Sequence, residues 1–534
     1  MAEPAQQFDV LVIGAGINGA GIARDAAGRG LSVVLAERGD LAGATSSASS
    51  KLIHGGLRYL EHREFRLVAE ALAEREVLLS ICGHLAWPLE FVLPHAPHLR
   101  PRWMLRAGLF LYDRLGGRSS LPRSRAVALD ETPYRGILKP AFRHGFAYAD
   151  GWVDDARLVV LNVRDAVDRG AILRRGWEVL GTTRIADSDT AGGLWQVEMC
   201  ELASDRRQLI NCRAIVNAGG PWAEEIHRRL LGTDAHAVPG ARPMPRLKHV
   251  KGSHIVVPRL YPGAHAYLLQ HPDRRVVFVI PFGAQCTLIG TTDVDVGDDY
   301  AQPEASAAEV EYLCELVNRY LQCAVRPADV IWRYSGVRAL ADDGASDASS
   351  VTRDYSLHID RAARDGAPLL SVLGGKITTY RALAQTVIER LAPWFPALGE
   401  AWTARVPLPG ADLGPGGYAG LRRSLLARWP QLDPRMLDGL ARRHGTLTET
   451  VLDGATTPAD LGRHFGGGLH EREIDYLYRR EWVAGLSPAA AVEAILWRRT
   501  KCGLLMTDEE REAILSYVSD QSNLPGRPAD AAAI

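Results

Sequence analysis

Three glycines and a carboxylate near the start of the chain have the types and spacing needed to bind a dinucleotide. Gly14, Gly16 and Gly19 follow an apolar run. Glu37 ends a second apolar run, 18 residues after Gly19. Such glycines let the backbone approach a pyrophosphate at a helix N-terminus, and the carboxylate accepts hydrogen bonds from a ribose. The pattern predicts a dinucleotide site. Its place in the sequence suggests the adenosine half of FAD and leaves NAD open.

A polar segment follows, in which residues 45–59 read TSSASSKLIHGGLRY. Its hydroxyl groups could donate hydrogen bonds to a phosphate, and His54 with the adjacent glycines could lie against a cofactor ring. Arg58 and Tyr59 could reach a substrate. Composition alone favours a polar surface loop over a binding site, so both interpretations stay open.

Cations beside glycines or aromatic residues recur farther along the chain. Arg338 lies in YSGVR, Arg353 in TRDY, and Lys376 in GGK before a predicted helix. With Arg58 they could surround a phosphate dianion, because a guanidinium group donates paired hydrogen bonds to one anion. The helix N-terminus at Lys376 could also stabilise negative charge on a reduced flavin. For each arginine taken alone, an exposed surface position is favoured over a binding role. For Lys376, an exposed turn and a binding site are equally compatible with the spacing.

Candidates for acid–base chemistry are few. His254 lies in the apolar run SHIVVP, where a lone histidine is more often a core residue than a base. It is of interest because its strand is predicted to cover the site. The adjacent pair Asp154 and Asp155 should point apart in regular structure, and no cluster has the spacing of metal ligands.

Residues 100–118 combine five arginines with apolar side chains such as Trp103 and Phe110. This composition is typical of an amphipathic helix at a membrane surface, and it also suits a packed helix with a charged outer face. Both interpretations stay open.

The elements that must position these residues read as an α/β sheet with an insertion. Residues 213–217 and 369–373 are apolar strands that run into glycine turns, and glycine turns gather at the ligand-binding edge of an open sheet. Residues 248–258 and 276–292 read as mostly antiparallel strands of a second sheet that roofs the site. Beyond the Pro- and Gly-rich residues 407–420 the pattern is helical, with start signals at Asp433 and Thr507.

Composition excludes several classes of protein. The formal net charge of −1 gives no overall attraction to nucleic acid, and seven scattered cysteines argue against a disulfide framework or zinc site. We see no signal peptide and no apolar run of about 18 residues that could span a bilayer.

Longer segments of the chain resemble one known family. They are GAGINGAGIARDAAGRGLSVVLAE, the segment DLAGATSSASSKLIHGGLRYLEHREFRLVAEALAERE, and KGSHIVVPR, IGTTDVD, YSGVRAL, TRDY and GGKITTYR. They resemble the bacterial FAD-dependent, aerobic-type glycerol-3-phosphate dehydrogenases over nearly the whole length, and this outweighs the surface-loop interpretation of residues 45–59. One departure is visible. The family turn Asn-Ala-Thr-Gly-Pro-Trp reads Asn217-Ala218-Gly219-Gly220-Pro221-Trp222 here, and we expect its cofactor contact to survive through backbone.

The resemblance implies an activity and a fold. The activity is hydride transfer from C2 of sn-glycerol 3-phosphate to N5 of FAD, which forms dihydroxyacetone phosphate, with electrons passed to membrane quinone. The fold is α/β, with an FAD-binding Rossmann-type domain of the glutathione-reductase-like, D-amino-acid-oxidase type. A mostly antiparallel substrate domain is inserted, and a helical C-terminal domain follows. Alternatives are an oxidase that releases hydrogen peroxide, a non-catalytic flavin-binding protein, and an amine or amino-acid oxidase.

The resemblance also assigns residues. The catalytic residues are His254, as the base, and Arg338, which stabilises the developing alkoxide. The residues that bind the substrate phosphate are Arg58, Tyr59, Arg353 and Lys376. The FAD-binding residues are Gly14, Gly16, Gly19, Glu37, Arg38, Thr45, Ser46, Ser47, Lys51, His54, Gly55, Ala218, Gly219, Gly336, Gly374, Gly375, Lys376, Ile377 and Thr378. No metal is expected.

The expected domains and surroundings complete the sequence-based description. Residues 1–80, 150–235 and 330–395 form the FAD-binding domain, and residues 81–149 and 236–329 the substrate domain. A linker (405–420), a helical domain (421–522) and a disordered tail (523–534) follow. The family implies a cytoplasmic homodimer that is peripheral on the cytoplasmic face of the bacterial inner membrane. Residues 100–118 are the candidate segment for this attachment, and no nucleic-acid partner is expected.

Overall fold

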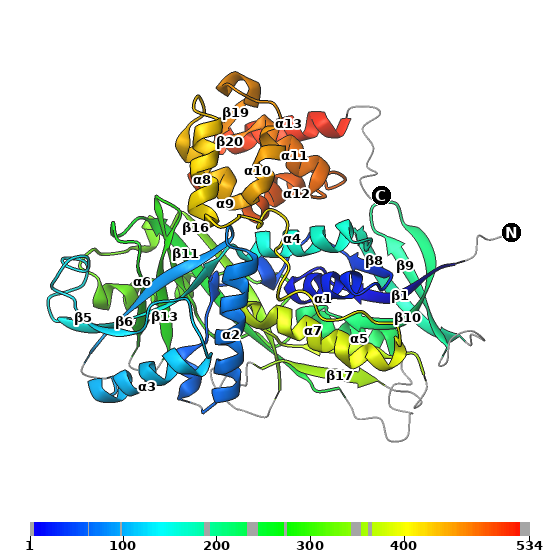
Figure 1. Ribbon diagram of the computed structural model, residues 1–534, viewed down its shortest axis with the longest axis horizontal. Coiled ribbons are helices and arrows are strands. Elements are labelled where there is room, and N and C mark those ends of the chain that lie inside the picture. The colour runs from blue at the N-terminus through cyan, green and yellow to red at the C-terminus, as the bar shows by residue number, and fades with distance from the viewer. Residues whose placement is uncertain are drawn as a thin grey trace.

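The computed structural model describes residues 5–61, 63–96, 99–185, 193–231, 244–271, 275–342, 354–360 and 366–523, and only the backbone of Arg58. Figure 1 shows three parts: a sheet with flanking helices at the right, a second sheet at the left, and a helical region above them.

The first sheet is the α/β layer that the glycine motif predicts. Five parallel strands lie in the order β18 (Leu369–Leu373), β10 (Arg206–Asn217), β1 (Gln6–Ile13), β2 (Val33–Glu37) and β7 (Ile172–Arg175). Antiparallel strands at its margins are β17 (Ser356–Asp360), β9 (Leu194–Glu201) and β8 (Trp177–Ile185).

Alternate residues of β1 face two separate cores, because successive side chains of a strand point to opposite faces. Val10 and Val12 pack with α1 (Ile17–Gly28), α4 (Asp155–Asp168) and α7 (Tyr380–Leu391). The intervening side chains of β1 pack with β8, β9 and α5 (Ala223–Leu231). The sheet is therefore covered on both sides, which confirms the predicted fold class.

The second sheet is mostly antiparallel. Its order is β15 (Val294–Asp295), β11 (Leu247–Pro258), β14 (Cys286–Gly290), β13 (Val276–Phe282), β12 (Ala266–Gln270), β4 (Ala86–Pro94), β6 (His144–Val153) and β3 (Leu52–Ile53), with β16 (Trp332–Ala341) beside β11 and β5 (Arg125–Ala128) beside β6. One face packs on α6 (Ala307–Tyr320), and the other packs on α2 (Phe65–Ile81) and α3 (Arg102–Leu115).

Two strands correct the expected domain boundaries. Strand β16 lies within 330–395 and β3 within 1–80, the ranges expected in the FAD-binding domain, and both belong to the second sheet. The cause is pairing across the chain: β16 runs alongside β11 from Leu247↔Ala341 to Val256↔Trp332. Sequence spacing does not encode such a partner. The rest of the predicted division stays a prediction.

The C-terminal helical region, residues 417–523, has a core of its own. Its main helices are α8 (Gly417–Arg428), α9 (Pro434–His444), α10 (Thr448–Leu452), α11 (Glu471–Arg480), α12 (Pro488–Glu493) and α13 (Asp508–Asn523). The side chain of Asp433 accepts hydrogen bonds from the first turn of α9, as predicted. Helix α8 begins inside the predicted linker, and the predicted disordered tail beyond residue 523 lies outside the described residues.

Candidate active site

The carboxyl ends of four parallel strands meet at one edge of the first sheet. Ile13 is in register with Asn217 on one side and Ala36 on the other, and Asn217 is in register with Ser371. The segments that follow these strands therefore converge. They contain most of the predicted FAD-binding residues, which places those residues at the ligand-binding edge of the sheet.

Two glycines let α1 begin directly against this edge. Gly14 adopts a φ of +98°, and a Cβ there would lie 2.8 Å from the carbonyl oxygen of Ala218. A Cβ on Gly19 would lie 1.8 Å from the carbonyl oxygen of Gly14. Only glycine permits this approach of helix to turn. The resulting cradle of backbone amides at a helix N-terminus fits the pyrophosphate of a dinucleotide.

Glu37 binds backbone amides of the same turn through its carboxylate. One of its carboxylate oxygens accepts a hydrogen bond from Ala15 N and the other from Gly39 N, both at 2.7 Å. Burial raises the pKa of this carboxyl group above its ordinary value. A carboxylate fixed at the end of β2 is suited to a ribose diol, whereas the neighbouring Arg38 is exposed to solvent.

The polar segment 45–51 lies between the two sheets and is not a surface loop. Ser46 Oγ accepts a hydrogen bond from Ile17 N at 2.9 Å, and Thr45 Oγ1 donates to the carbonyl of Val337 on β16 at 2.7 Å. Gly336 lets β16 approach the segment, since a Cβ there would lie 2.8 Å from that of Ala48. The segment therefore joins the N-terminus of α1 to the second sheet.

Lys51, a predicted FAD-binding residue, takes part in a buried ion pair. Its side chain and that of Asp155 are fully buried, with Nζ 2.9 Å from both carboxylate oxygens. Nζ also donates to the carbonyl of Ser47 at 3.1 Å. These contacts of the ammonium group support segment 47–51, and a contact of Lys51 with FAD stays a prediction.

Residues predicted from separate segments meet around Tyr59. Lys376 Nζ lies 3.8 Å from the centroid of the Tyr59 ring. His54 N donates to Thr378 Oγ1 at 3.2 Å, and Gly55 N donates to the hydroxyl of Tyr112 at 2.8 Å. The segment around His54 is thus tied both to the turn after β18 and to α3.

His254 is buried on β11, behind this region. Its Nε2 lies 2.8 Å from Ser50 Oγ, and its ring stacks on Tyr334 with centroids 4.9 Å apart. Nδ1 is buried without a hydrogen-bond partner among the described residues. Burial, and then the charges of Lys51 and Arg338, hold the pKa of His254 well below its ordinary value. These surroundings therefore favour the neutral form of the imidazole.

Arg338 lies on β16 and is oriented by an acidic neighbour. One guanidinium nitrogen is 2.5 Å from a carboxylate oxygen of Asp293, and another donates to Thr291 Oγ1 at 3.2 Å. Val250 is its partner in register on β11, four residues before His254. Two predicted phosphate ligands cannot be placed, because Arg353 and the side chain of Arg58 lie outside the described residues.

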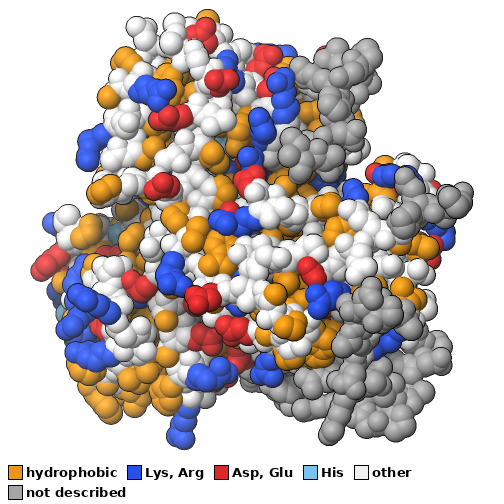
Figure 2. All heavy atoms as spheres, turned by 45° about the vertical axis from the view of Figure 1, so that its right-hand side comes forward, with side chains coloured by type: hydrophobic (Ala, Val, Ile, Leu, Met, Phe, Trp, Pro, Cys, Tyr) orange, Lys and Arg blue, Asp and Glu red, His pale blue; other side chains and the backbone are white. Residues whose placement is uncertain are grey.

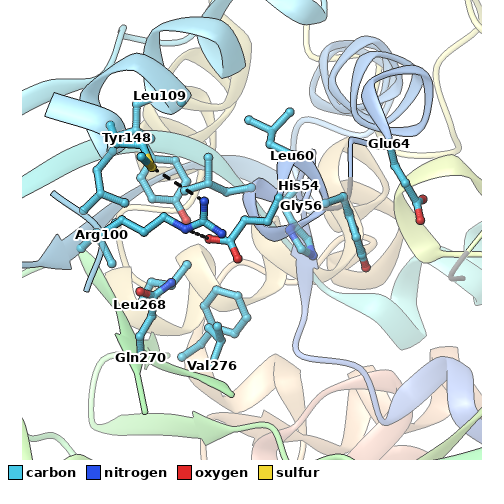
Figure 3. Close-up of a pocket in the computed structure, with 18 of the residues that line it drawn as sticks. His54, Gly56, Leu60, Glu64, Arg100, Leu109, Tyr148, Leu268, Gln270 and Val276 are labelled. Carbon is cyan, nitrogen blue, oxygen red and sulfur yellow. Dashed lines mark hydrogen bonds and ion pairs between the residues drawn. The ribbon is translucent and has the colours of Figure 1, made fainter. Parts of the chain in front are cut away.

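A cavity of about 240 Å³ opens beside these residues, between α3 and the second sheet. His54, Tyr59, Thr291 and Asp293 contribute polar atoms to its wall. Figure 3 shows Arg100 and Tyr148 at one side and His54 at the other. Apolar side chains line much of the remainder, namely Leu57, Leu60, Leu93, Met104, Leu105, Leu109, Leu268, Val276 and Phe278. Glu61, Glu64, Arg100 and Gln270 also line the cavity, so polar and apolar side chains share its wall.

Three residues near His254 and Arg338 were missed by sequence reasoning. Ser50 and Asp293 lie inside segments that carried the family resemblance, so their motifs were seen but their partners were not. Asp155 was noted only as half of an adjacent carboxylate pair. Asp154 pairs with Lys501 and Asp155 with Lys51, but Lys501 Nζ also lies 4.0 Å from Asp155 Oδ1, so the two carboxylates face one pair of lysines.

Comparison with known proteins gives one consistent family. A family model described as FAD dependent oxidoreductase matches residues 9–381. The glycerol-3-phosphate dehydrogenase of Pseudomonas aeruginosa is 48% identical over 525 residues, which cover 98% of this chain and 97% of that protein. The D-erythritol 1-phosphate dehydrogenase of Brucella abortus is 45% identical over 524 residues, covering 98% and 100%. The crystal structure of the glycerol-3-phosphate dehydrogenase from Bacillus halodurans complexed with FAD aligns with a TM-score of 0.65 and 25% identity, covering 97% and 94%.

Proposed function

The chain belongs to the FAD-dependent oxidoreductases and, among them, to the glycerol-3-phosphate dehydrogenases, and we propose that it oxidises sn-glycerol 3-phosphate to dihydroxyacetone phosphate. FAD is the cofactor. The observation that supports this substrate best is that two cations contact the wall of one cavity, Lys376 through Tyr59 and Arg338 through Asp293. His254 lies on β11, the strand paired with the strand of Arg338.

The residues divide the reaction between binding and proton transfer. FAD, when bound, supplies the acceptor for the hydride that leaves C2 of the substrate. The neutral His254 takes the proton of the C2 hydroxyl, for which a positioned base contributes roughly 10²–10⁴-fold. Arg338, oriented by Asp293, stabilises the negative charge that develops on that oxygen. Lys376 binds the phosphate with Tyr59 beside it, and Arg58 and Arg353 are assigned there by family resemblance.

Anaerobic mixing with substrate tests this proposal. Purified holoenzyme should lose its flavin absorbance near 450 nm when sn-glycerol 3-phosphate is added without air, and the product should be dihydroxyacetone phosphate. A yellow protein that is not bleached would instead be a flavin-binding protein without this activity. An unchanged KM for glycerol 3-phosphate in Arg353→Ala would remove that residue from the phosphate site.

A longer polyol phosphate is the second candidate substrate, because the relative named D-erythritol 1-phosphate dehydrogenase is 45% identical over nearly the whole chain. The two substrates share a phosphate and a secondary alcohol and differ by one hydroxymethylene group. Comparing kcat/KM for the two under the same conditions decides between them. A ratio of tenfold or more in favour of glycerol 3-phosphate supports the first proposal, and the reverse ratio supports the second.

We assign the electrons to a membrane quinone because apolar side chains, those of α3 among them, line much of the cavity. An apolar ring system fits such a wall better than a charged carrier does. The rival acceptor is oxygen, as in an oxidase. Reduction of a soluble quinone analogue with little peroxide supports the quinone, and one equivalent of peroxide per substrate oxidised supports the oxidase.

We assign attachment to a lipid surface to α3. Leu109 and Tyr112 are buried under this helix, whereas Trp103 and Phe110 are 69% and 51% exposed among the exposed Arg102, Arg106 and Arg114. Figure 2 shows hydrophobic and basic side chains together at the lower left of the molecule, where Figure 1 places α3. No helix within the described residues is long and apolar enough to cross a bilayer.

Vesicle binding tests the assignment of α3. Trp103→Ser with Phe110→Ser should lower partitioning onto anionic vesicles at least tenfold, because each exposed ring adds roughly 1.5 kcal/mol or more on burial, and should leave dye-linked activity unchanged. Equal binding would place the membrane contact elsewhere. The cytoplasmic face of the inner membrane and a homodimer remain predictions from the family, and fractionation and light scattering check them.

A further inference from the structure

A stack of aromatic rings connects the C-terminal helical region to His254. Trp497 stacks on Trp332 of β16 with centroids 4.6 Å apart and planes at 15°. Trp332 lies 4.7 Å from Tyr334, whose ring stacks on His254 at 13°. Aromatic pairs at such separations hold each other in a defined orientation. The plane of the imidazole is therefore set by rings that end in the C-terminal helical region.

A chain of charges runs alongside the rings. Lys501 Nζ lies 2.7 Å from Asp154 Oδ1 and 4.0 Å from Asp155 Oδ1, and Asp155 pairs with the buried Lys51. Burial alone would raise the pKa of Asp154, but Lys501 lowers it below its ordinary value, so the pair is ionised. Lys51 and Lys501 both adopt a positive φ, 59° and 63°, which persists in side-chain-bearing residues only where the surroundings enforce it.

Both connections end at segment 47–51. Asp155 accepts hydrogen bonds from the hydroxyl and the amide of Ser49, at 2.8 Å and 3.1 Å. The hydroxyl of Tyr334 donates to the carbonyl of Ser49 at 2.8 Å. The next residue, Ser50, makes the hydrogen bond to His254 Nε2. The position of Ser50, and with it one hydrogen bond of the imidazole, therefore depends on Lys501 through Asp155.

We propose that Lys501 and Trp497 are positioning residues for His254, so that the C-terminal helical region completes the active site from outside the two sheets. This inference rests on the proposed role of His254 as proton acceptor. It differs from a purely structural role, because other contacts hold the region in place. Arg157 pairs with Glu481, and Arg499 pairs with Asp40, in each case across the same interface. Loss of Lys501 should leave the region docked and loosen segment 47–51.

Two variants and a matched control test the proposal in the holoenzyme. Lys501→Met removes the charge chain, and Trp497→Leu removes the ring stack. Arg175→Met is the control. Arg175 donates to the carbonyl of Ala484 at 2.7 Å across the interface, but it belongs neither to the row of charged residues nor to the stack of aromatic rings. The measurements are FAD content, the rate of flavin reduction by glycerol 3-phosphate without air, the Kd for dihydroxyacetone phosphate, and hydrogen exchange in peptides covering residues 45–54 with and without FAD.

The expected result separates positioning from folding. Each of the two variants should slow flavin reduction about tenfold or more, since small misplacement of a reacting group is costly, with FAD content and product Kd within twofold of wild type. Exchange in residues 45–54 should rise in both and stay unchanged in Arg175→Met. Lys501→Arg and Trp497→Phe, which keep the charge and the ring, should recover most of the rate.

Two outcomes would overturn the inference. One is wild-type reduction and exchange in Trp497→Leu, a variant that also decides the matter if Lys501→Met does not fold. The other is equal slowing in Arg175→Met, which would show that docking of the whole region is responsible. If the wild-type flavin is not reduced by glycerol 3-phosphate, the proposed function fails instead, and exchange in residues 45–54 still decides whether Lys501 and Trp497 hold the segment.

Discussion

The two sheets contribute to the active site in different ways. The carboxyl edge of the first sheet offers mainly backbone: glycine turns, a helix N-terminus and one carboxylate fixed by backbone amides. The facing edge of the second sheet offers side chains, His254 and Arg338, each held by partners distant in the sequence. A site built from backbone depends on shape and on small residues, whereas a site built from side chains depends on their supports.

The largest effect is expected at the backbone edge. Gly19→Val should abolish FAD binding and lower the free energy of unfolding by about 3 kcal/mol, because a Cβ there would meet the carbonyl oxygen of Gly14 at 1.8 Å. Gly181→Ala is the control, since nothing lies within 4 Å of its added Cβ. Flavin-to-protein ratio and urea unfolding measure both effects. Full FAD occupancy in Gly19→Val would contradict the close approach.

A change at the side-chain edge should affect rate and spare the cofactor. His254→Asn should slow flavin reduction by roughly 10²-fold or more, with FAD still bound, because the proton acceptor is lost. Stopped-flow absorbance under anaerobic conditions gives the rate. Single-turnover reduction at the wild-type rate would remove His254 as the base and break the contrast between the two edges.

Lys376 lies where the two edges meet and should show a mixed effect. Lys376→Met should raise KM for glycerol 3-phosphate roughly 10- to 100-fold, because a charge-assisted hydrogen bond contributes about 1.5–3 kcal/mol. Lys139→Met serves as the control, since Lys139 is an exposed lysine that donates to the carbonyl of Asn318. Initial-rate kinetics separate KM from kcat. A fall in kcat with an unchanged KM would indicate that Lys376 acts in the chemical step and does not bind the phosphate.

The smallest effect concerns a property that the two sheets share. Burial lowers the pKa of His227, beside the first sheet, and of His265, beside the second, to about 4 in each case. The folded protein keeps both neutral while the unfolded chain binds protons below about pH 6.5, so stability should fall as the pH drops from 6.5 to 4.

Substitution of either histidine should weaken that pH dependence equally. The free energy of unfolding of the wild type should fall between pH 7 and pH 5. In His227→Asn and in His265→Asn that fall should be about 2 kcal/mol smaller. Urea unfolding of the holoenzyme at the two pH values gives the comparison. A pH dependence as steep as that of wild type in one variant would show that its histidine is protonated in the folded protein.

The contrast between the edges also explains what the sequence could predict. The turn at Gly14, the helix start near Gly19 and the strand end at Glu37 were predictable because they lie within one short stretch of sequence. The pairing of β16 with β11 was not predictable, because it joins segments about 80 residues apart that were expected in different domains. Asp155 was missed for the same reason, since Lys51 lies 104 positions away.

The interpretation of residues 100–118 shows a further limit. Composition left a membrane helix and a packed helix both open, and α3 has a packed face at Leu109 and Tyr112 and an exposed one at Trp103 and Phe110. The exposed fraction of each side chain depends on the sheet beneath the helix, which periodicity alone does not reveal.

The contact of Arg499 with Asp40 has a consequence for biogenesis. Asp40 closely follows β2, the strand that ends at Glu37, yet its partner Arg499 lies 459 positions later in the chain. During translation, therefore, the region around the cofactor leaves the ribosome long before the residues that complete it. Chains that end prematurely should lack the contact of Arg499 with Asp40 that completes the region around the cofactor. Only full-length chains should then transfer electrons.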